Sequence, residues 1–308
     1  MTLTALVALA ATRQASDLHL EVGLPPTIRR RGELLPLGEP LASADLEAMV
    51  REVVDPADLE GLERRGSHDV SRGIAGVRCR VNVLRSLRGY GLAVRLLPGR
   101  TPTLADLNLH PDLAELAAAT HGLVLISGAT GSGKSSTLAA LVQEINLHQR
   151  RHVVTVEEPV EYRLRPVEAF IRQREVGRDT PSFEQALLDA LRQDPDVIMV
   201  GELREPEVMR LTLNAAETGH LVLATLHSST AAEALQRLVM AFPAEIQRSV
   251  AAQVADCLLA VVCQHLRYRP ELDLQVPECE ILRGSVAARS VIRQCEFSKL
   301  ASVLETGG

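Results

Sequence analysis

Nine consecutive residues near the middle of the chain have the types and spacing of a phosphate-binding loop: Gly128, Ala129, Thr130, Gly131, Ser132, Gly133, Lys134, Ser135 and Ser136. They contain the P-loop pattern G-x-x-x-x-G-K-[ST] between an apolar run and a helical pattern. The glycines allow the backbone to turn several N–H groups towards an anion, and a helix starting at Lys134 aims its positive end there. Lys134 is expected to reach the β- and γ-phosphates of a nucleotide, and the Ser135 hydroxyl to ligate Mg²⁺. The alternative is a glycine-rich turn that binds nothing, and the complete motif disfavours it.

Carboxylates follow two further apolar runs and are candidates to act on the same nucleotide. Glu202 is the candidate for the vicinity of Mg²⁺, through water, because the Asp usual in this motif is replaced by Gly201. Glu157, Glu158 and Glu161 follow the other run, and the C-terminal ends of parallel strands are where open α/β sheets bind ligands. One of these three could orient or deprotonate an attacking water. A solvated acidic turn is the alternative, and spacing alone does not decide between the two.

Two histidines, His220 and His227, bracket the apolar run LVLATL. A histidine at each end of one strand could sense or bridge phosphates. Such pairs are more often structural, and a metal site is disfavoured because no third ligand stands at a familiar spacing.

The elements that must position these side chains follow from hydrophobic periodicity. In the second part of the chain short apolar runs alternate with helical patterns, which is typical of a parallel sheet flanked by helices. Strands are expected there at 123–127, 153–156, 197–200 and 221–225, and helices at 104–120, 134–148, 183–192, 206–218 and over most of 230–259. The first part indicates an α+β module, with helices at 3–15, 43–54 and 56–65 and strands at 17–21, within 27–37, at 77–84 and at 90–96. The stretch PGRTP predicts a linker between domains 1–99 and 100–308.

Composition narrows the classes of protein that fit. The net charge is −6, aromatic residues make up 2% and Trp is absent, so neither a basic footprint nor base-stacking platforms for nucleic acid are expected. The five cysteines form no C-x-x-C pair, which fits neither a zinc site nor a disulfide framework and indicates reduced thiols in the cytoplasm. No run of 18 apolar residues occurs, so no direct membrane insertion is expected.

Five segments stand in the order and spacing found in the type II/IV secretion ATPases: SGATGSGKSSTLAALVQEIN, VVTVEEPVEY, IRQREVGRDTPSF, ALRQDPDVIMVGELRE and NAAETGHLVLATLHSSTAAEALQRL. The chain most resembles the PilT/PilU-like branch, which powers type IV pilus retraction, and ASDLHLEVGLPPTIRRRGELLPL and VRCRVN extend the likeness towards the N-terminus. The resemblance implies an α/β fold, with a RecA-like P-loop NTPase domain preceded by a smaller α+β PAS-like domain. It also implies a homo-hexamer that hydrolyses ATP with Mg²⁺ and reaches the inner membrane through a pilus platform protein. A paralogous retraction ATPase would be a further partner.

The resemblance assigns roles residue by residue. Glu157 matches the catalytic glutamate that activates water, and Glu202 the Walker B glutamate near Mg²⁺. His220 and His227 match the histidine box.

Three arginines match family arginines that meet phosphates or relay nucleotide state between subunits in trans: Arg78, Arg80 and Arg237. A guanidinium suits that role because it stabilises charge on the transferred phosphoryl group. The alternative is ordinary surface arginine.

The chain also departs from the family pattern. Glu158 replaces the usual Asp of the acidic box, and Glu205 the usual Asp after the Walker B arginine. Each adds a methylene where errors of about 1 Å can cost about a hundredfold in rate. The segment AARSVIRQ at 287–294 is a degraded form of one linked to retraction. Retraction is favoured over pilus assembly or secretion because assembly motors commonly carry paired cysteines. An ATP-binding accessory subunit with weak or no hydrolysis stays open, and a DNA translocase is disfavoured by the acidic charge.

Overall fold

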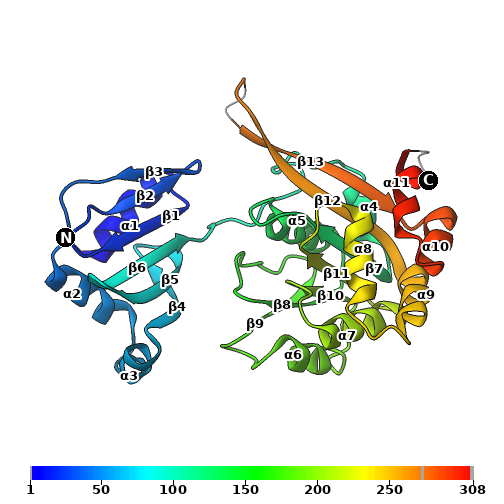
Figure 1. Ribbon diagram of the computed structural model, residues 1–308, viewed down its shortest axis with the longest axis horizontal. Helices are drawn as coiled ribbons and strands as arrows, with labels where there is room; N and C mark the ends of the chain where they lie inside the picture. Colours follow the sequence, from blue (N-terminus) through cyan, green and yellow to red (C-terminus); the bar gives the residue numbers. More distant parts are fainter. Residues whose placement is uncertain (1, 272–273, 306–308) are drawn as a thin grey trace. The chain divides into compact units, whose positions relative to one another are not determined.

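The computed structural model describes residues 2–271 and 274–305 and divides the chain into two compact units, residues 1–100 and 101–308 (Figure 1). Unit 1 is an antiparallel sheet of six strands in the order β3-β2-β1-β6-β5-β4. Its strands are β1 (Asp17–Glu21), β2 (Thr27–Arg30), β3 (Glu33–Pro36), β4 (Ser67–Ile74), β5 (Val77–Ser86) and β6 (Gly89–Leu96). Its helices are α1 (Leu3–Thr12), α2 (Ser43–Val53) and α3 (Pro56–Arg65).

One face of the unit 1 sheet is buried because apolar residues alternate along its strands. In β5 the buried positions are Cys79, Val81 and Val83, and the polar residues between them are only half-buried. The three helices pack on the apolar face and form one core with it. Arg78 and Arg80 therefore belong to the opposite face of β5.

Unit 2 is built on a seven-stranded sheet in the order β13-β12-β7-β11-β10-β8-β9, parallel except for the edge strand β13. Its strands are β7 (Gly122–Ser127), β8 (His152–Glu157), β9 (Phe170–Glu175), β10 (Val197–Val200), β11 (Leu221–Leu226), β12 (Leu258–Arg269) and β13 (Leu274–Arg283). Its helices are α4 (Leu113–Ala118), α5 (Lys134–His148), α6 (Phe183–Ala190), α7 (Pro206–Glu217), α8 (Ala231–Met240), α9 (Gln247–Cys257), α10 (Val286–Arg293) and α11 (Leu300–Glu305), with a 3-10 turn η1 (Phe297–Lys299) before α11.

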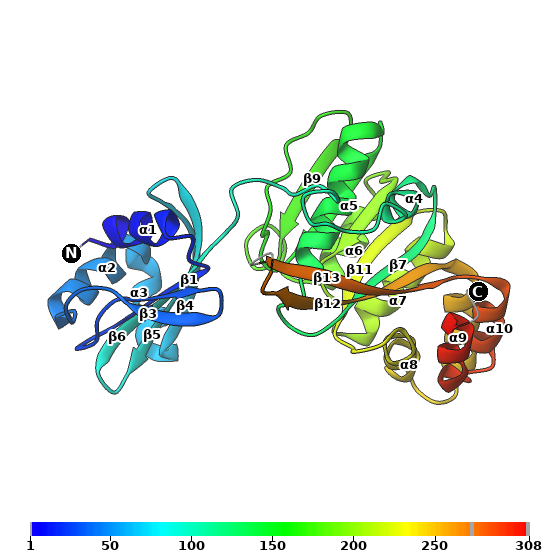
Figure 2. The same cartoon turned by 90° about the horizontal axis from the view of Figure 1, so that it is seen from above.

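Helices cover both faces of the unit 2 sheet, which explains why its central strands are continuously apolar. Every residue of β7, β10 and β11 is buried. Helices α4 and α5 form a core with one face, and α7, α8 and α9 with the other (Figure 2). The predicted fold class, a P-loop α/β domain preceded by a smaller α+β domain, is confirmed.

The helix predicted at 104–120 is wrong over most of its length, because only α4 forms there. Pro111 disfavours helical backbone at the residue before it. Upstream, the Asp106 carboxylate accepts hydrogen bonds from the amide and hydroxyl of Thr103, and Asn108 has a left-handed φ of 52°. Local side-chain to backbone bonds of this kind compete with a helix.

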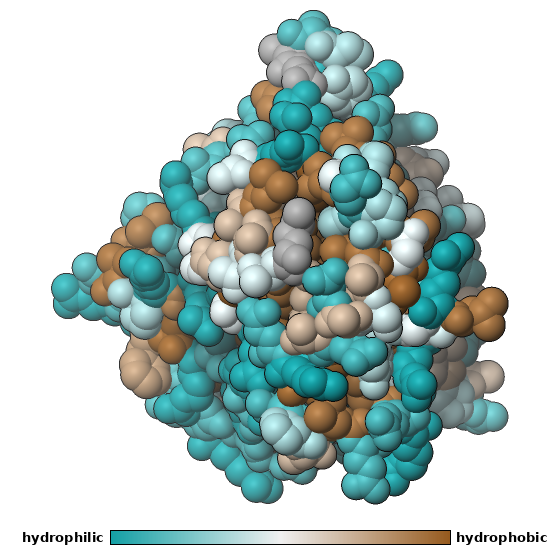
Figure 3. All heavy atoms as spheres, turned by 90° about the vertical axis from the view of Figure 1, so that its left-hand side faces the viewer, coloured by the Kyte–Doolittle hydropathy of each residue, from teal (hydrophilic) through white to brown (hydrophobic). Residues whose placement is uncertain are grey.

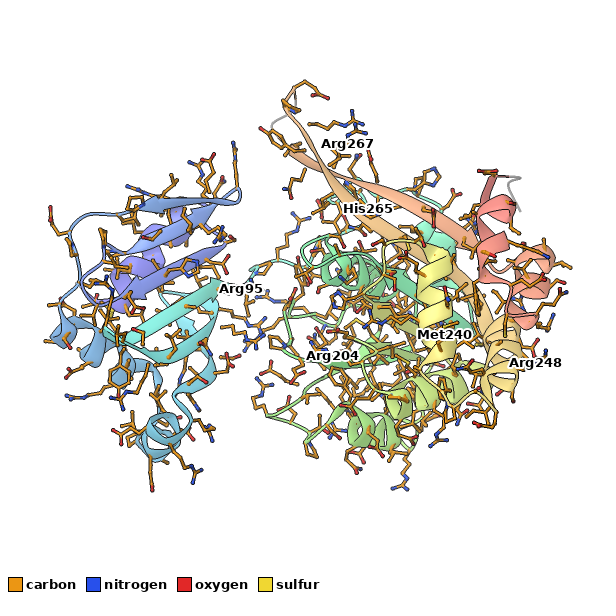
Figure 4. The ribbon with its side chains drawn as sticks, viewed as in Figure 1. Arg95, Arg204, Met240, Arg248, His265 and Arg267 are labelled. Atoms are coloured by element: carbon orange, nitrogen blue, oxygen red, sulfur yellow. The ribbon has the colours of Figure 1, made fainter. Side chains whose placement is uncertain are left out.

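The sequence patterns also missed a long hairpin. β12 begins at Leu258, where the predicted helical region ends, and pairs with β13 along its length. The first half of β12 is the buried partner of β7, whereas 265–269 and 274–278 form a two-stranded ribbon that projects from the sheet. His265 and Arg267 lie on this ribbon (Figure 4).

The AARSVIRQ segment forms most of α10, and its first arginine has a structural contact. The Arg289 guanidinium donates to the carbonyls of Gly284, Asp256 and Leu258, the last two at the C-terminal end of α9. A cation at a helix C-terminus satisfies carbonyls that lack an intrahelical partner.

Within the described residues, no helix is both long and apolar enough to cross a membrane. On the face shown in Figure 3, hydrophobic residues lie in separate patches among hydrophilic ones.

Candidate active site

The predicted P-loop connects β7 to α5, and its glycines stand where a side chain would not fit. Gly128 has a φ of 145°, and a Cβ there would overlap the Gln264 carbonyl and the Ser132 hydroxyl. Gly133 has a φ of 88° and is the N-cap of α5, and a Cβ there would lie 2.7 Å from Nε2 of Gln264. No side chain caps the start of α5, so its first N–H groups are available to an anion.

Lys134 is buried and lies folded over its own loop. Its ammonium group donates to the carbonyls of Gly128 and Ala129, both at 2.9 Å, and lies 3.3 Å from Nδ1 of His227. Burial lowers the pKa of Lys134, and the nearby Glu202 opposes that shift. From this position the ammonium group of Lys134 can exchange its two loop carbonyls for phosphate oxygens while the rest of the side chain stays beside the loop.

His227 connects Lys134 to Glu202, the carboxylate predicted to lie near Mg²⁺. An ammonium group has no acceptor, so Nδ1 of His227 must accept from Lys134. Nε2 then carries the hydrogen and donates to Oε1 of Glu202 at 2.9 Å. Just after His227, Ser127 at the end of β7 exchanges two hydrogen bonds with the backbone of Ser228, at 2.9 and 3.1 Å. These bonds fix the loop that carries the histidine.

Glu202 is held on both oxygens. Its second oxygen lies 2.7 Å from the guanidinium of Arg204, which also reaches Glu158 at 3.6 Å. Burial alone would raise the pKa of Glu202. The hydrogen bond from Arg204 and the charges of Arg204, His227 and Lys134 outweigh burial and lower that pKa. The carboxylate is therefore kept ionised, as a group near Mg²⁺ must be.

Glu157 is in a different environment, at the buried end of β8. Burial raises its pKa to about 7, although hydrogen bonds from Thr155 and Gln173 oppose the shift. Both donors bind the same oxygen, Oε1, at 2.7 and 3.1 Å. A buried carboxyl whose pKa is raised towards neutrality is typical of a general base at a catalytic site, whereas the lowered pKa of Glu202 suits a group that stays ionised.

Sequence reasoning missed several residues of this site, and three of them surround Glu157 and the segment after it. Gln173 on β9 donates to the Tyr162 carbonyl as well as to Glu157, and its own oxygen accepts from the Leu164 amide. The Tyr162 hydroxyl lies 2.7 Å from that of Ser136, which connects the P-loop helix to the segment after Glu157. Thr155 is a further one, through its hydrogen bond to Glu157. The motif IRQREVG contained Gln173, but its contact with Glu157 depends on the pairing of β9 with β8.

The structure brings together the P-loop, Glu157, Glu202 and His227 but not His220. His220 stands just before β11 and His227 just after it, so the two histidines lie at opposite ends of the same strand, roughly 20 Å apart for a strand of this length. Its Nδ1 lies 2.9 Å from the Ala215 carbonyl at the end of α7.

The three predicted arginines are distributed over both units. Arg237 on α8 donates to the His227 carbonyl at 2.8 Å and lines a groove of about 380 Å³ beside it. Arg78 and Arg80 lie on β5 of unit 1, where Arg80 lies 3.6 Å from Asp69.

Glu205, which stands where the family pattern has Asp, is the N-cap residue of α7.

The loop fits a nucleotide phosphate and a hydrated metal ion. The Ser132 hydroxyl is buried and has no hydrogen-bond partner within the described residues, so a bound group can satisfy it. Ser135, at the exposed start of α5, and Glu202 are the residues that would hold Mg²⁺. Nowhere in 2–271 or 274–305 are three or more His, Cys, Asp or Glu side chains grouped to hold a metal by themselves. This fits Mg²⁺, which usually takes few protein ligands and keeps water and phosphate oxygens.

Comparison with known proteins extends the likeness to the whole chain. The family described as Type II/IV secretion system protein matches residues 2–301. The type IV pilus retraction ATPase PilT of Pseudomonas aeruginosa is 38% identical over 310 residues, covering 100% of this chain and 90% of that protein. The uncharacterized protein YggR of Escherichia coli K12 is 42% identical over 311 residues, covering 100% and 94%. The crystal structure of the pilus retraction motor PilT with bound ADP has a TM-score of 0.92 at 36% identity, covering 99% of this chain and 90% of that one.

Proposed function

The chain belongs to the type II/IV secretion system protein family and is an ATPase, as its motifs indicated, and we propose that it drives retraction of a type IV pilus. The observation that carries the proposal is the end-to-end likeness to a retraction motor in both sequence and fold. An accessory subunit that only binds ATP needs no general base, whereas this chain keeps Glu157 at the buried end of β8, with hydrogen bonds from Thr155 and Gln173.

In the proposed reaction the chain's own groups bind, orient and move a proton. The P-loop amides and Lys134 hold the phosphates, and Lys134 leaves the carbonyls of Gly128 and Ala129 to do so. Glu157 accepts the proton of the attacking water, for which a base of pKa near 7 is suited. Mg²⁺, when bound, neutralises charge on the β- and γ-phosphates. Ser135 and Glu202 would hold it, and Arg204 and His227 keep Glu202 in place.

We further propose that the working form is a hexameric ring in which each site is completed by a neighbouring subunit. Arg78, Arg80 and Arg237 would meet the phosphates or report nucleotide state across the subunit boundary. In a ring closed by head-to-tail contacts, the surface that carries each site faces a second, different surface of its neighbour, and this arrangement repeats at every boundary, as action in trans requires. ATP turnover would then move one domain against the other, and a platform protein at the inner membrane would transmit that motion to the pilus, with a paralogous retraction ATPase as an additional partner.

The test combines enzymology with a deletion strain. The purified protein should release phosphate from ATP with Mg²⁺, and Lys134→Ala and Glu157→Ala should each abolish release. A strain without the gene should carry surplus surface pili and fail to twitch, and only the wild-type gene should restore motility. Cells without pili would identify an assembly motor instead. ATP binding without turnover by the wild type would identify an accessory subunit.

A further inference from the structure

Gln264 lies behind the P-loop and joins it to β12. The parallel pairing of β7 with β12 ends at Ser127 and Cys263. The residues that follow these two in the chain, Gly128 and Gln264, therefore lie against one another. Only 3% of Gln264 is exposed. It is separated from the loop by more than 120 positions in sequence, and no motif of the nucleotide site contains it.

The side-chain amide of Gln264 makes two hydrogen bonds, and the chemistry of its partners fixes its orientation. Nε2 donates to the Ser132 carbonyl at 2.7 Å, and Oε1 accepts from the Thr137 hydroxyl at 2.6 Å. A backbone carbonyl can only accept, so the amide nitrogen must face Ser132. One side chain thus connects the loop to the first turn of α5.

The contact with Ser132 bears on phosphate binding. A loop that turns its N–H groups towards an anion must turn its carbonyls elsewhere and satisfy them there. The amide of Gln264 satisfies the Ser132 carbonyl on the side of the loop that faces β12. Gly128 packs against the backbone carbonyl of Gln264 and Gly133 against its side-chain amide, so the volume of Gln264 as well as its hydrogen bonds limits the shapes that the loop can adopt.

We propose that Gln264 is a positioning residue for nucleotide binding, which keeps the Ser132 carbonyl turned away from the phosphates and fixes the loop to α5 through Thr137. The proposal rests on nucleotide binding at this P-loop, which is part of the proposed function.

The test is the affinity for a fluorescent ADP analogue with Mg²⁺, measured beside thermal unfolding and steady-state kinetics. Gln264→Glu keeps the size of the side chain and an acceptor for Thr137, but once its carboxyl is ionised, as binding at pH 9 ensures, it puts an oxygen without a hydrogen against the Ser132 carbonyl. We expect the dissociation constant and KM to rise about tenfold or more, because a buried carbonyl loses its donor, while kcat falls less than about threefold. The matched control is Gln275→Glu at an exposed position of β13, which should bind as the wild type does.

A second pair of variants approaches the same contact from the helix. Thr137→Val removes the hydroxyl at nearly constant volume and should also weaken binding, whereas Thr137→Ser keeps the hydroxyl and should restore it. If Gln264→Glu does not fold, the difference in affinity between the two Thr137 variants tests the role of Gln264 instead. Unchanged affinity in Gln264→Glu with a lowered melting temperature, or equal affinity in the two Thr137 variants, would overturn the proposal. Failure of the wild type to bind would instead overturn the proposed function.

Discussion

The ammonium nitrogen of Lys134 lies 3.3 Å from Nδ1 of His227, although 93 positions separate the two residues in the chain. Lys134 begins the helix after β7, and His227 follows the neighbouring strand β11. Through Nε2, His227 also holds Glu202, so Lys134 and Glu202 share one imidazole.

His227→Phe should therefore lower kcat about 10- to 100-fold, the usual cost of losing a group that orients a metal-side ligand. The phenyl ring fills the space but can neither accept from Lys134 nor donate to Glu202. Steady-state phosphate release checks this, with His148→Phe on the exposed end of α5 as the control. A loss below threefold would contradict the role given to His227.

The raised pKa of Glu157 should cost stability at neutral pH. Its pKa is about 7 in the folded chain and about 4.5 in the unfolded one. Between these values the folded state holds a proton that the unfolded state has released, so the free energy of unfolding falls as pH rises from 4.5 to 7. Glu157→Gln should thus abolish turnover yet stabilise the protein at pH 8 by up to about 3 kcal/mol. Urea unfolding at pH 4 and pH 8 measures this, with the exposed Glu245→Gln as control. Equal stability of Glu157→Gln and wild type at pH 8 would refute it.

Gln173→Glu should shift the pH dependence of hydrolysis. A second carboxylate would then lie about 3 Å from Oε1 of Glu157, and a like charge raises the pKa of a neighbouring acid. The rate depends on ionised Glu157, so the pH of half-maximal kcat should rise by about one unit. Gln193→Glu, at a half-buried position after α6, is the matched control. A profile that falls in height without moving would show that Gln173 acts only through packing.

The presence of Glu158, where the family pattern has Asp, should have little effect on turnover. Glu158 is about half exposed and meets Arg204 at 3.6 Å, and exposed ion pairs contribute about 0–1 kcal/mol. Glu158→Asp should change kcat by less than about threefold in either direction. A tenfold gain in the same phosphate-release assay would show that the longer side chain impairs the site.

The proposed action of the unit 1 arginines in trans predicts complementation between inactive subunits. The Arg78→Ala/Arg80→Ala double variant lacks the arginines, and Lys134→Ala lacks the P-loop lysine. If the arginines act on a neighbour's nucleotide, mixing the two after dissociation should restore up to about a quarter of wild-type activity, because random assembly pairs intact halves at about one boundary in four. If rings that are shown to contain both variants recover no activity, the arginines act on the nucleotide of their own subunit.

The sequence by itself determined the P-loop, the two parallel-sheet carboxylates and the two-part α/β fold, because each is a local pattern set by backbone geometry. It failed where local and distant interactions compete. Turns fixed by Asp106 and Pro111 replace most of the helix expected at 104–120. The apolar run of β12 was not recognised as a strand, because such a run fits helix and strand equally.

Tertiary structure alone decided which side chains meet. The strand order brings the ends of β7, β8, β10 and β11 to one edge of the sheet, so Lys134, Glu157, Glu202 and His227 converge there. The same order places His220 at the other edge, although its sequence distance from the P-loop resembles that of His227. Gln173 and Gln264 reach the site through pairing with β8 and β7, and strand pairing is a long-range property that no single segment encodes.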